Sequence, residues 1–410
     1  MILNKNQKIY IYLFGIFSLV ISSIMGENSS GGSKIDNEIT RQFIDNFLIS
    51  FDHGIKYFII TGQVQSPIFY ILASFIEKIL GFNFLKYSYL LISSLIPAIF
   101  YIALKKKFIR INENILFLLS LIIFLSPYFR SSAVWVTTDN FAIIFFILSV
   151  SKYLDFEEKN TNKNIVLCIF YISIAVYIRQ YYIIFFLFYF LKFLQVLKLK
   201  KIFNLIFLIT IIFIPYVVYY YYFFKANIID QSFGKNTFDI DILNNILIFS
   251  SLYLFYTIPF YINNLTEIKK NIFKNLNKCL IIFFVFGAIY FYYSISLNTF
   301  GGGVFIKISS ILNSKIIFLI SSFLGTLLIL MNLNKNNFIV YLCLIFAFPT
   351  IIIYQKYFDP LLIMAVLTLT KGGMLNQILN LNKINLIYIY SYFIFFLIIS
   401  NLYYSLSLWI

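Results

Sequence analysis

Two carboxylates near the start of the chain, Asp36 and Glu38, stand two residues apart in the stretch "GGSKIDNEI". A carboxylate held beside a hydroxyl can take up its proton, which is the task of a general base. Acidic loops are also common as solvated surface, and spacing alone does not separate the two readings. The pair therefore marks a candidate catalytic base, with the choice between Asp36 and Glu38 left open.

Other charged residues interrupt apolar runs further along the chain. Arg179, followed by Gln180, lies in "YIRQYYIIF", and Asp139 follows Thr138 in "VWVTTDNFA". An arginine can bind a phosphate or carboxylate through two parallel hydrogen bonds. Charges at membrane depth are costly and are candidates for function. The alternatives are an arginine that anchors a turn at the headgroups and an aspartate that caps a helix.

Three more cations are candidates to help hold an anion. They are Arg130 in "SPYFRSS", Lys307 in "GGGVFIKIS" and Lys356 in "YQKYFDP". Each by itself is typical of a side chain that reaches the membrane interface. Their shared position at helix ends on one expected face favours a joint role, and the triple glycine allows close backbone approach to a ligand.

The composition identifies the elements that must position these residues. Of the 410 residues 61% are hydrophobic and 12% are charged. Apolar runs recur along the chain at the length that a helix needs to cross a bilayer, about 20 residues. A barrel would show short alternating segments instead. We expect an all-α, polytopic transmembrane bundle formed by one domain, 1–410. The net charge of +16 lies in short loops between apolar runs, so we expect membrane lipid and not nucleic acid as a partner.

Fourteen apolar segments are candidates for crossing the membrane. They are 9–25, 66–82, 86–104, 114–129, 139–154, 165–178, 181–197, 202–223, 245–263, 279–297, 315–332, 338–354, 360–370 and 385–409. The segment 66–82 begins at Pro67, carries Glu77 and Lys78 and ends at Gly81, which suits a helix lying along the outer interface. We therefore predict about thirteen crossings, with the N-terminus inside and the C-terminus outside.

The distribution of charge supports this topology. Inside segments then carry 20 of the 32 Lys and Arg residues but only 5 of the 16 Asp and Glu residues, as the positive-inside rule requires. The largest outer segment is 26–85, which we expect to form a first outer loop with juxtamembrane helices. Polar chemistry is thus expected on the outer face of the membrane.

The order of the motifs resembles that of the GT-C glycosyltransferases, most closely the alpha-1,2-glucosyltransferase family of lipid-linked oligosaccharide assembly. The resemblance covers roughly residues 9–190. Its matching positions are Asp36 or Glu38, Ile60, Thr61, Pro67, Tyr70, Thr138, Asp139, Arg179 and Gln180. Here Asn37 separates the two carboxylates, and Ser66 precedes Pro67 where the family has a second proline.

This resemblance implies an inverting hexosyltransferase that takes a sugar from a polyprenyl-phosphate donor at the outer or lumenal face. Asp36 or Glu38 would be the base, and Arg179 would meet the leaving phosphate, assisted by Lys307, Lys356 and Arg130. A glycan or lipid-linked hydroxyl would be the acceptor. No cofactor is expected; a divalent cation is compatible with the carboxylates, although no spacing requires one.

The implied location is the cell inner membrane or the endoplasmic reticulum, for a multi-pass integral membrane protein with its N-terminus cytoplasmic. The alternatives are a polysaccharide flippase or transporter and a polymerase of lipid-linked repeat units. A transporter would place charges along a path through the membrane, and such polymerases usually carry their large loop late in the chain.

Overall fold

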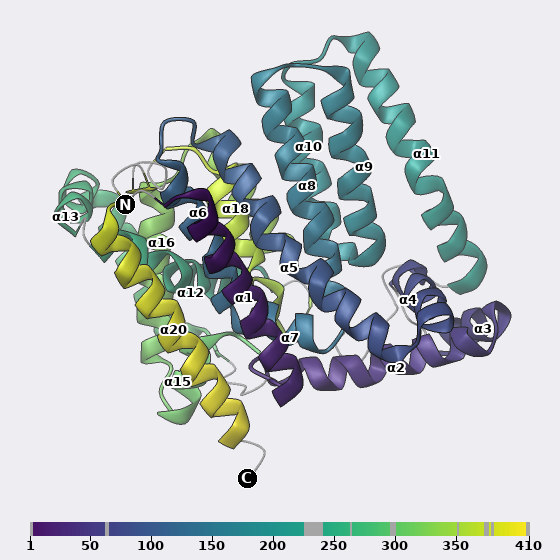
Figure 1. Cartoon of the computed structure of the whole chain (residues 1–410). Coiled ribbons are helices and arrows are strands. Elements are labelled where there is room, and N and C mark those ends of the chain that lie inside the picture. The colour runs from purple at the N-terminus through teal and green to yellow at the C-terminus, as the bar shows by residue number, and fades with distance from the viewer. Residues whose placement is uncertain are drawn as a thin grey trace. The chain divides into compact units, whose positions relative to one another are not determined.

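The structure is a computed structural model that describes residues 3–61, 65–224, 241–262, 265–295, 301–350, 352–372, 377–378 and 381–406. Within these residues it contains nineteen α-helices and no β-strand (Figure 1). The predicted all-α class is therefore confirmed. Residues 62–64, which belong to the "ITGQVQSPIFY" motif, lie outside the described residues.

The chain divides into two compact units, where the sequence analysis expected one domain. The first unit contains Met1–Phe238 with Phe393–Ile410, and the second contains Asp239–Tyr392. The helices of the first unit are α1 (Lys5–Met25), α2 (Ser33–Ile49), α3 (Phe51–Thr61), α4 (Ile68–Leu80), α5 (Phe82–Lys107), α6 (Glu113–Leu121), η1 (Ile122–Leu125), α7 (Pro127–Val134), α8 (Thr138–Glu158), α9 (Asn162–Ile178), η2 (Gln180–Tyr182), α10 (Ile183–Leu194) and α11 (Leu199–Phe224). Helix α20 (Lys383–Leu406) begins in the second unit and ends in the first.

Four helices of the described chain are long and apolar enough to cross a membrane: α1, α5, α12 and α20. The number rises to six if each of two bent helix pairs counts as one span. Other predicted segments form shorter apolar helices, such as Asn162–Ile178 and Ile316–Met331. Several long apolar helices are thus compatible with a membrane protein, and the number of thirteen crossings stays a prediction.

The predicted span 114–129 is broken in the structure. Helix α6 and the 3-10 turn η1 end before Ser126, and α7 then starts at Pro127 with a bend of 64°. A residue before proline avoids the helical conformation, and Ser126 is extended. The Ser126 hydroxyl also accepts a hydrogen bond from the Phe129 amide at 3.0 Å, so the proline and the cap together start a new helix.

The segment 26–85, which was expected to form the first outer loop, is largely helical. Helix α1 ends at Gly26, whose φ of 65° is the left-handed conformation common at helix ends. Helices α2, α3 and α4 follow and pack on one another, running crosswise to α8 and α9 in Figure 1. Helix α4 has 13 residues and is therefore about 20 Å long, too short for a hydrocarbon core of about 30 Å. Its length fits the expected interfacial position.

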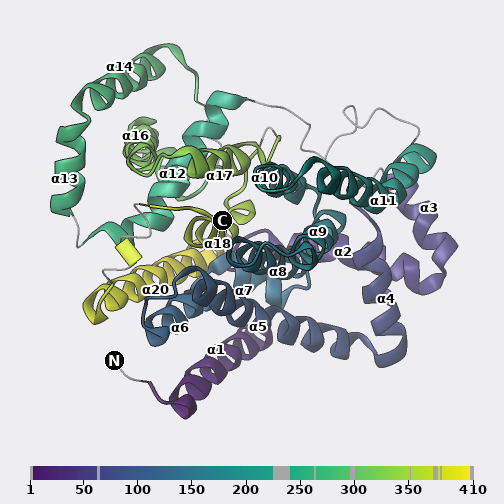
Figure 2. The ribbon, with the colours of Figure 1, turned by 90° about the horizontal axis from the view of Figure 1, so that it is seen from above.

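The longest helices of the first unit pack side by side. Helix α8 lies between α5 and α9, and α9 in turn contacts α10 and α11, as Figure 2 shows from above. The face of α8 toward these neighbours is apolar and buried, including Ala142, Phe146 and Val150, each with 0% exposed surface. This packing brings the ends of α8 and α9 together, which matters for the site below.

The second unit is built around α12, which contacts α16, α17 and α18. Its helices are α12 (Ile242–Tyr261), α13 (Leu265–Lys274), α14 (Leu276–Tyr292), α15 (Val304–Ile311), α16 (Ile316–Met331), α17 (Lys335–Phe346), η4 (Gln355–Tyr357) and α18 (Leu361–Leu369). Gly325 allows α16 to lie directly against α12, because a Cβ there would be only 1.8 Å from the Ser250 carbonyl oxygen.

Candidate active site

Helices α8 and α9 form a tight hairpin that determines which residues meet. Helix α8 ends at Glu158 and α9 begins at Asn162, so the connection is short and the helices run antiparallel. The start of α8 therefore lies beside the end of α9. Asp139 is in the first turn of α8, and Arg179 is the residue that directly follows α9. Two residues forty positions apart in the sequence are thus brought to one place.

Asp139 and Arg179 form a shielded ion pair. The Arg179 Nη2 group donates to Asp139 Oδ2 at 2.8 Å, and the two side chains are 15% and 11% exposed. Each charge suits its helix end, because a helix N-terminus favours an anion and a C-terminus favours a cation. Asp139 does not act as the cap residue of α8, since Thr137 occupies that position. Its carboxylate instead orients the guanidinium.

The backbone around this pair is held by hydroxyl groups. The Tyr89 hydroxyl donates to the Thr137 carbonyl, and the Ser132 and Thr137 hydroxyls are 2.7 Å apart. The Tyr181 hydroxyl donates a long hydrogen bond of 3.5 Å to Asp139 Oδ1. Tyr89 and Ser132 therefore hold Thr137, the N-cap residue of α8, while Tyr181 bonds the Asp139 carboxylate itself.

The guanidinium of Arg179 keeps one donor unused. Its Nε atom is buried and has no hydrogen-bond partner within the described residues. Burial acts to lower the pKa of Arg179, but the charges of Asp139, Tyr181, Tyr70 and Asp36 outweigh it and raise the pKa. The side chain is therefore a fixed cation with a free N–H. Buried donors are rarely left unpaired in proteins, so this one is a candidate contact for a ligand.

The two candidate bases point in different directions. Residues two positions apart on a helix are separated by about 200°, so Asp36 and Glu38 lie on nearly opposite sides of α2. Asp36 shares a face with the buried Thr40, Phe43 and Phe47, is half-buried, and contributes to the electrostatic field at Arg179. Glu38 is exposed. Helix α2 thus turns Asp36, and not Glu38, toward the Asp139–Arg179 pair.

The two neighbours of the pair lie at the same helix ends. Thr138 is the first residue of α8 and is 2% exposed, and Gln180 opens the 3-10 turn η2 and is half-buried. The structure therefore brings together five of the predicted residues: Asp36, Thr138, Asp139, Arg179 and Gln180. Sequence reasoning did not single out Tyr89 or Tyr181, because tyrosine occurs 33 times in this chain.

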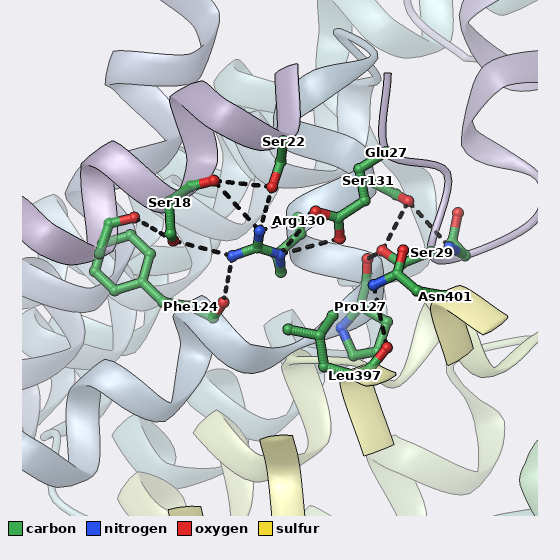
Figure 3. Close-up of polar contacts among 12 residues, drawn as sticks. Ser18, Ser22, Glu27, Ser29, Phe124, Pro127, Arg130, Ser131, Leu397 and Asn401 are labelled. Atoms are coloured by element: carbon green, nitrogen blue, oxygen red, sulfur yellow. Dashed lines mark hydrogen bonds and ion pairs between the residues drawn. The ribbon is translucent and has the colours of Figure 1, made fainter. Parts of the chain in front are cut away.

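Arg130 has a different environment from the one the sequence suggested. It lies on α7 and forms a buried ion pair with Glu27 at 2.8 Å, with side chains 8% and 10% exposed (Figure 3). Its other N–H groups donate to the Ser18 hydroxyl and the Phe124 carbonyl, both at 3.1 Å, and to the Ser22 hydroxyl. All five of its N–H donors are thus bonded within the protein, which leaves none for a substrate.

The Arg130–Glu27 pair fixes the start of the outer segment. Glu27 follows α1 directly, and two residues later the Ser29 hydroxyl donates to the Pro127 carbonyl at 2.8 Å (Figure 3). The Ser131 hydroxyl accepts from the Ser30 amide at 3.0 Å. These bonds tie α1 and α7 to the loop that leads into α2 and so position Asp36. The sequence analysis missed Glu27; its only signal was an acidic residue directly after the first apolar run.

Lys307 and Lys356 belong to the second unit, whereas the residues described above belong to the first. Lys307 is on α15, where burial lowers its pKa to about 8. Lys356 lies in η4, with its Nζ 5.3 Å from the centre of the Tyr354 ring. The glycines before α15 have φ of 98°, 71° and 89°, and the Gly302 amide donates to the Ile353 carbonyl at 2.6 Å. The triple glycine thus lets the backbone approach the chain's own segment 352–353.

Among the described ranges of the chain, no three or more His, Cys, Asp or Glu side chains are grouped closely enough to hold a metal ion. The comparisons with known proteins give no relative: no family model, no curated protein and no solved structure matches this chain. The function must therefore be argued from the geometry.

Proposed function

We propose that this protein is a GT-C type membrane glycosyltransferase with about thirteen crossings. It would transfer a sugar from a polyprenyl-phosphate donor to a glycan or lipid-linked hydroxyl at the outer or lumenal face, with inversion at the anomeric carbon. Asp36 is the proposed base and Arg179 the proposed phosphate ligand. Asp139 is a positioning residue for Arg179.

The observation that carries this proposal is the shielded Asp139–Arg179 pair with its unused Nε–H and with Asp36 in its electrostatic field. A buried ion pair with every donor satisfied would support only a structural role. A fixed cation with a free donor beside a carboxylate has the two components that this transfer needs. The carboxylate accepts a proton, and the cation meets a developing negative charge.

The reaction is balanced in these terms. The acceptor oxygen bonds to the anomeric carbon as its proton passes to the Asp36 carboxylate. The bond from that carbon to the phosphate oxygen breaks, and the lipid phosphate leaves with its electron pair. Arg179 stabilises the added charge on this phosphate. Because the Nε–H of Arg179 has no hydrogen-bond partner within the described residues, it is available to donate to a phosphate oxygen.

The remaining predicted contacts have narrower roles. Thr138 and Gln180 are placed to line the same region, at the ends of α8 and α9. Lys307 and Lys356 belong to the second unit, and their assistance with the phosphate stays a prediction from the sequence. Arg130 is proposed to hold the loop before α2 and not to touch the substrate, because its donors are all used.

The test uses purified protein in nanodiscs with a panel of radiolabelled polyprenyl-phosphate monosaccharides and short lipid-linked glycans as acceptors. Transfer of label from donor to acceptor is followed for the wild type, Asp36→Asn and the matched control Glu38→Gln. We expect Asp36→Asn to lose about 10²- to 10⁴-fold in rate, the contribution of a general base. Glu38→Gln should keep its rate, because Glu38 is exposed on the opposite side of α2.

Three results contradict the proposal. An unchanged rate in Asp36→Asn would remove the assigned base, and a loss in Glu38→Gln alone would transfer that role to Glu38. Absence of turnover with every donor would remove the glycosyltransferase itself. In that case the protein would be reconstituted in vesicles. Translocation of lipid-linked sugar across the vesicle membrane would then be measured.

A further inference from the structure

A pocket in the first unit lies apart from the Asp139–Arg179 pair and is lined by both charged and apolar side chains. Three elements form it: one face of α2, the start of α5 and the turn between α7 and α8. Its lining residues are Asn37, Arg41, Ile44, Phe82, Leu85, Lys86, Val134, Trp135 and Val136. Cationic and amide groups thus share one small space with aliphatic and aromatic groups. This combination suits an amphiphile with a charged end.

Lys86 is the cation in this pocket without a counter-charge. Its Nζ donates to the Ser23 carbonyl at 3.4 Å, and within the described residues no carboxylate lies within 4 Å of it. The side chain is nevertheless half-buried. Arg41 differs, because it is paired with both Asp45 and Glu77. An anion in the pocket would therefore face one uncompensated ammonium group and the amide of Asn37.

The position of Lys86 along α5 indicates the depth of this site in a membrane. The other end of this candidate span carries Lys105, Lys106 and Lys107. Nineteen residues of helix between Lys86 and Lys105 measure about 29 Å, close to the thickness of a hydrocarbon core. Lys86 is therefore at headgroup level when the basic end of α5 is at the opposite surface. A phosphate of a membrane lipid would lie at this same level.

The wall of the pocket has an apolar part. Ile44, Phe82 and Leu85 belong to it, and a hydrocarbon chain attached to a bound phosphate would contact these side chains. The pocket wall also contains Val136, whose φ of 48° is a strained conformation for a β-branched residue. Such strain is most often found at functional sites.

We propose that this pocket binds the phosphate of a membrane-borne lipid, with Lys86 and Asn37 as its polar contacts. The site is separate from the proposed donor site at Arg179 and does not depend on glycosyl transfer. A polyprenyl phosphate, a phospholipid with a terminal phosphate and free phosphate share the recognised chemistry. The structure favours an attached chain, because five of the nine lining residues are aliphatic or phenyl groups.

The experiment measures binding of a fluorescent polyprenyl phosphate to the protein in phosphatidylcholine nanodiscs. An Asp139→Asn/Arg179→Met background removes the proposed donor site, so that any remaining binding reports the pocket alone. In this background we expect Lys86→Met to weaken binding about tenfold or more, the effect of losing one charge-assisted hydrogen bond. The matched control is Lys56→Met, which removes an exposed lysine of α3 and should leave binding unchanged.

Three comparisons keep the test independent of folding. Lys86→Arg should bind within about threefold of its parent, since it retains the charge. In the same Asp139→Asn/Arg179→Met background, neutral polyprenol should bind at least about tenfold more weakly than polyprenyl phosphate. The affinity for phosphatidate, measured in place of the probe, identifies which lipid class is preferred. Stronger binding of the lipid phosphates than of inorganic phosphate supports an attached chain.

The proposal is overturned if Lys86→Met binds as tightly as its parent, or if polyprenol and polyprenyl phosphate bind equally. Inorganic phosphate that binds as tightly as both lipid phosphates would also overturn it, because the attached chain would then contribute nothing. The transfer assay of the preceding section is scored separately. Loss of glycosyl transfer therefore leaves this binding result unaffected.

Discussion

The buried Arg130–Glu27 pair allows a sharp test of how the first unit is held together. The carboxylate accepts from Nε at 3.0 and 3.1 Å and from Nη2 at 2.8 Å. Glu27→Gln keeps the size of the side chain but removes its charge, so a guanidinium that is 8% exposed loses its counter-ion. Breaking a buried pair in this way costs about 3–5 kcal/mol. The loss is large because the remaining partners of Arg130 are neutral.

The assay is thermal unfolding of purified protein in detergent, followed by size-exclusion chromatography. A loss of this size should lower the midpoint by about 6–20 °C, at about 2–4 °C for each kcal/mol in a unit of this length. Arg130→Met should cause a similar loss. Glu27→Leu combined with Arg130→Met should recover most of it, because an apolar pair of similar volume avoids burying charge.

The matched control is Asp52→Asn, which breaks the Lys56–Asp52 pair on α3. Those side chains are 67% and 76% exposed, and exposed pairs contribute little. Its midpoint should change by no more than about 2 °C. The reasoning is refuted if Glu27→Gln behaves like Asp52→Asn, or if the double variant is no more stable than the single ones.

The same pair should make stability depend on pH. Burial acts to raise the pKa of Glu27, but its bonds to Arg130 outweigh burial and hold the pKa below its ordinary value of 4.5. A lowered carboxyl pKa stabilises the folded state above the ordinary value, and this stabilisation is lost as the pH falls through the lowered one. Glu27→Gln should therefore flatten the acid side of the stability profile.

Two further predictions concern the second unit. Because burial lowers the pKa of Lys307 to about 8 from 10.5, the unfolded chain binds more protons between these values. The free energy of unfolding should therefore rise with pH in that window, by about 3 kcal/mol at most. Lys307→Met should remove this slope. An unchanged slope in that variant would contradict the prediction. The second prediction concerns Gly325→Ala, which should lower the thermal midpoint. Its new Cβ would lie 1.8 Å from the Ser250 carbonyl oxygen and would force α16 away from α12. Such overpacking costs about 1–3 kcal/mol. Gly287→Ala on α14 is its control, with no atom within 4 Å of the new Cβ; equal midpoints for the two variants would show that the close contact does not hold the helices.

Local pattern was sufficient to locate the long apolar helices, but not α13 or α15, which lie outside the predicted apolar segments. Long apolar runs need internally satisfied backbone in lipid, so the sequence alone supports an all-α chain. Each predicted apolar segment corresponds to one or more helices within the described residues. Pattern did not show that 114–129 breaks at Ser126–Pro127, although Pro127 was visible in the sequence. A proline is compatible with either a kinked span or a new helix, and packing decides between them.

Only some residues of the candidate site could be predicted from the sequence. Asp139 and Arg179 were recognisable because a charge within an apolar run is costly, and the short connection between α8 and α9 explains why they meet. Arg130 was expected to assist Arg179 with the phosphate. The structure separates them, because the donors of Arg130 are all bonded while Nε of Arg179 is not.

The sequence by itself determined the all-α class, the positions of the long apolar helices and a short set of candidate residues. These follow from composition and from spacing along the chain. Only the tertiary structure decided that Asp36 faces Arg179 while Glu38 faces outward, and that Glu27 neutralises Arg130. The physical reason is that side-chain direction and the choice of partner depend on how helices pack, and residues distant in sequence supply the partners.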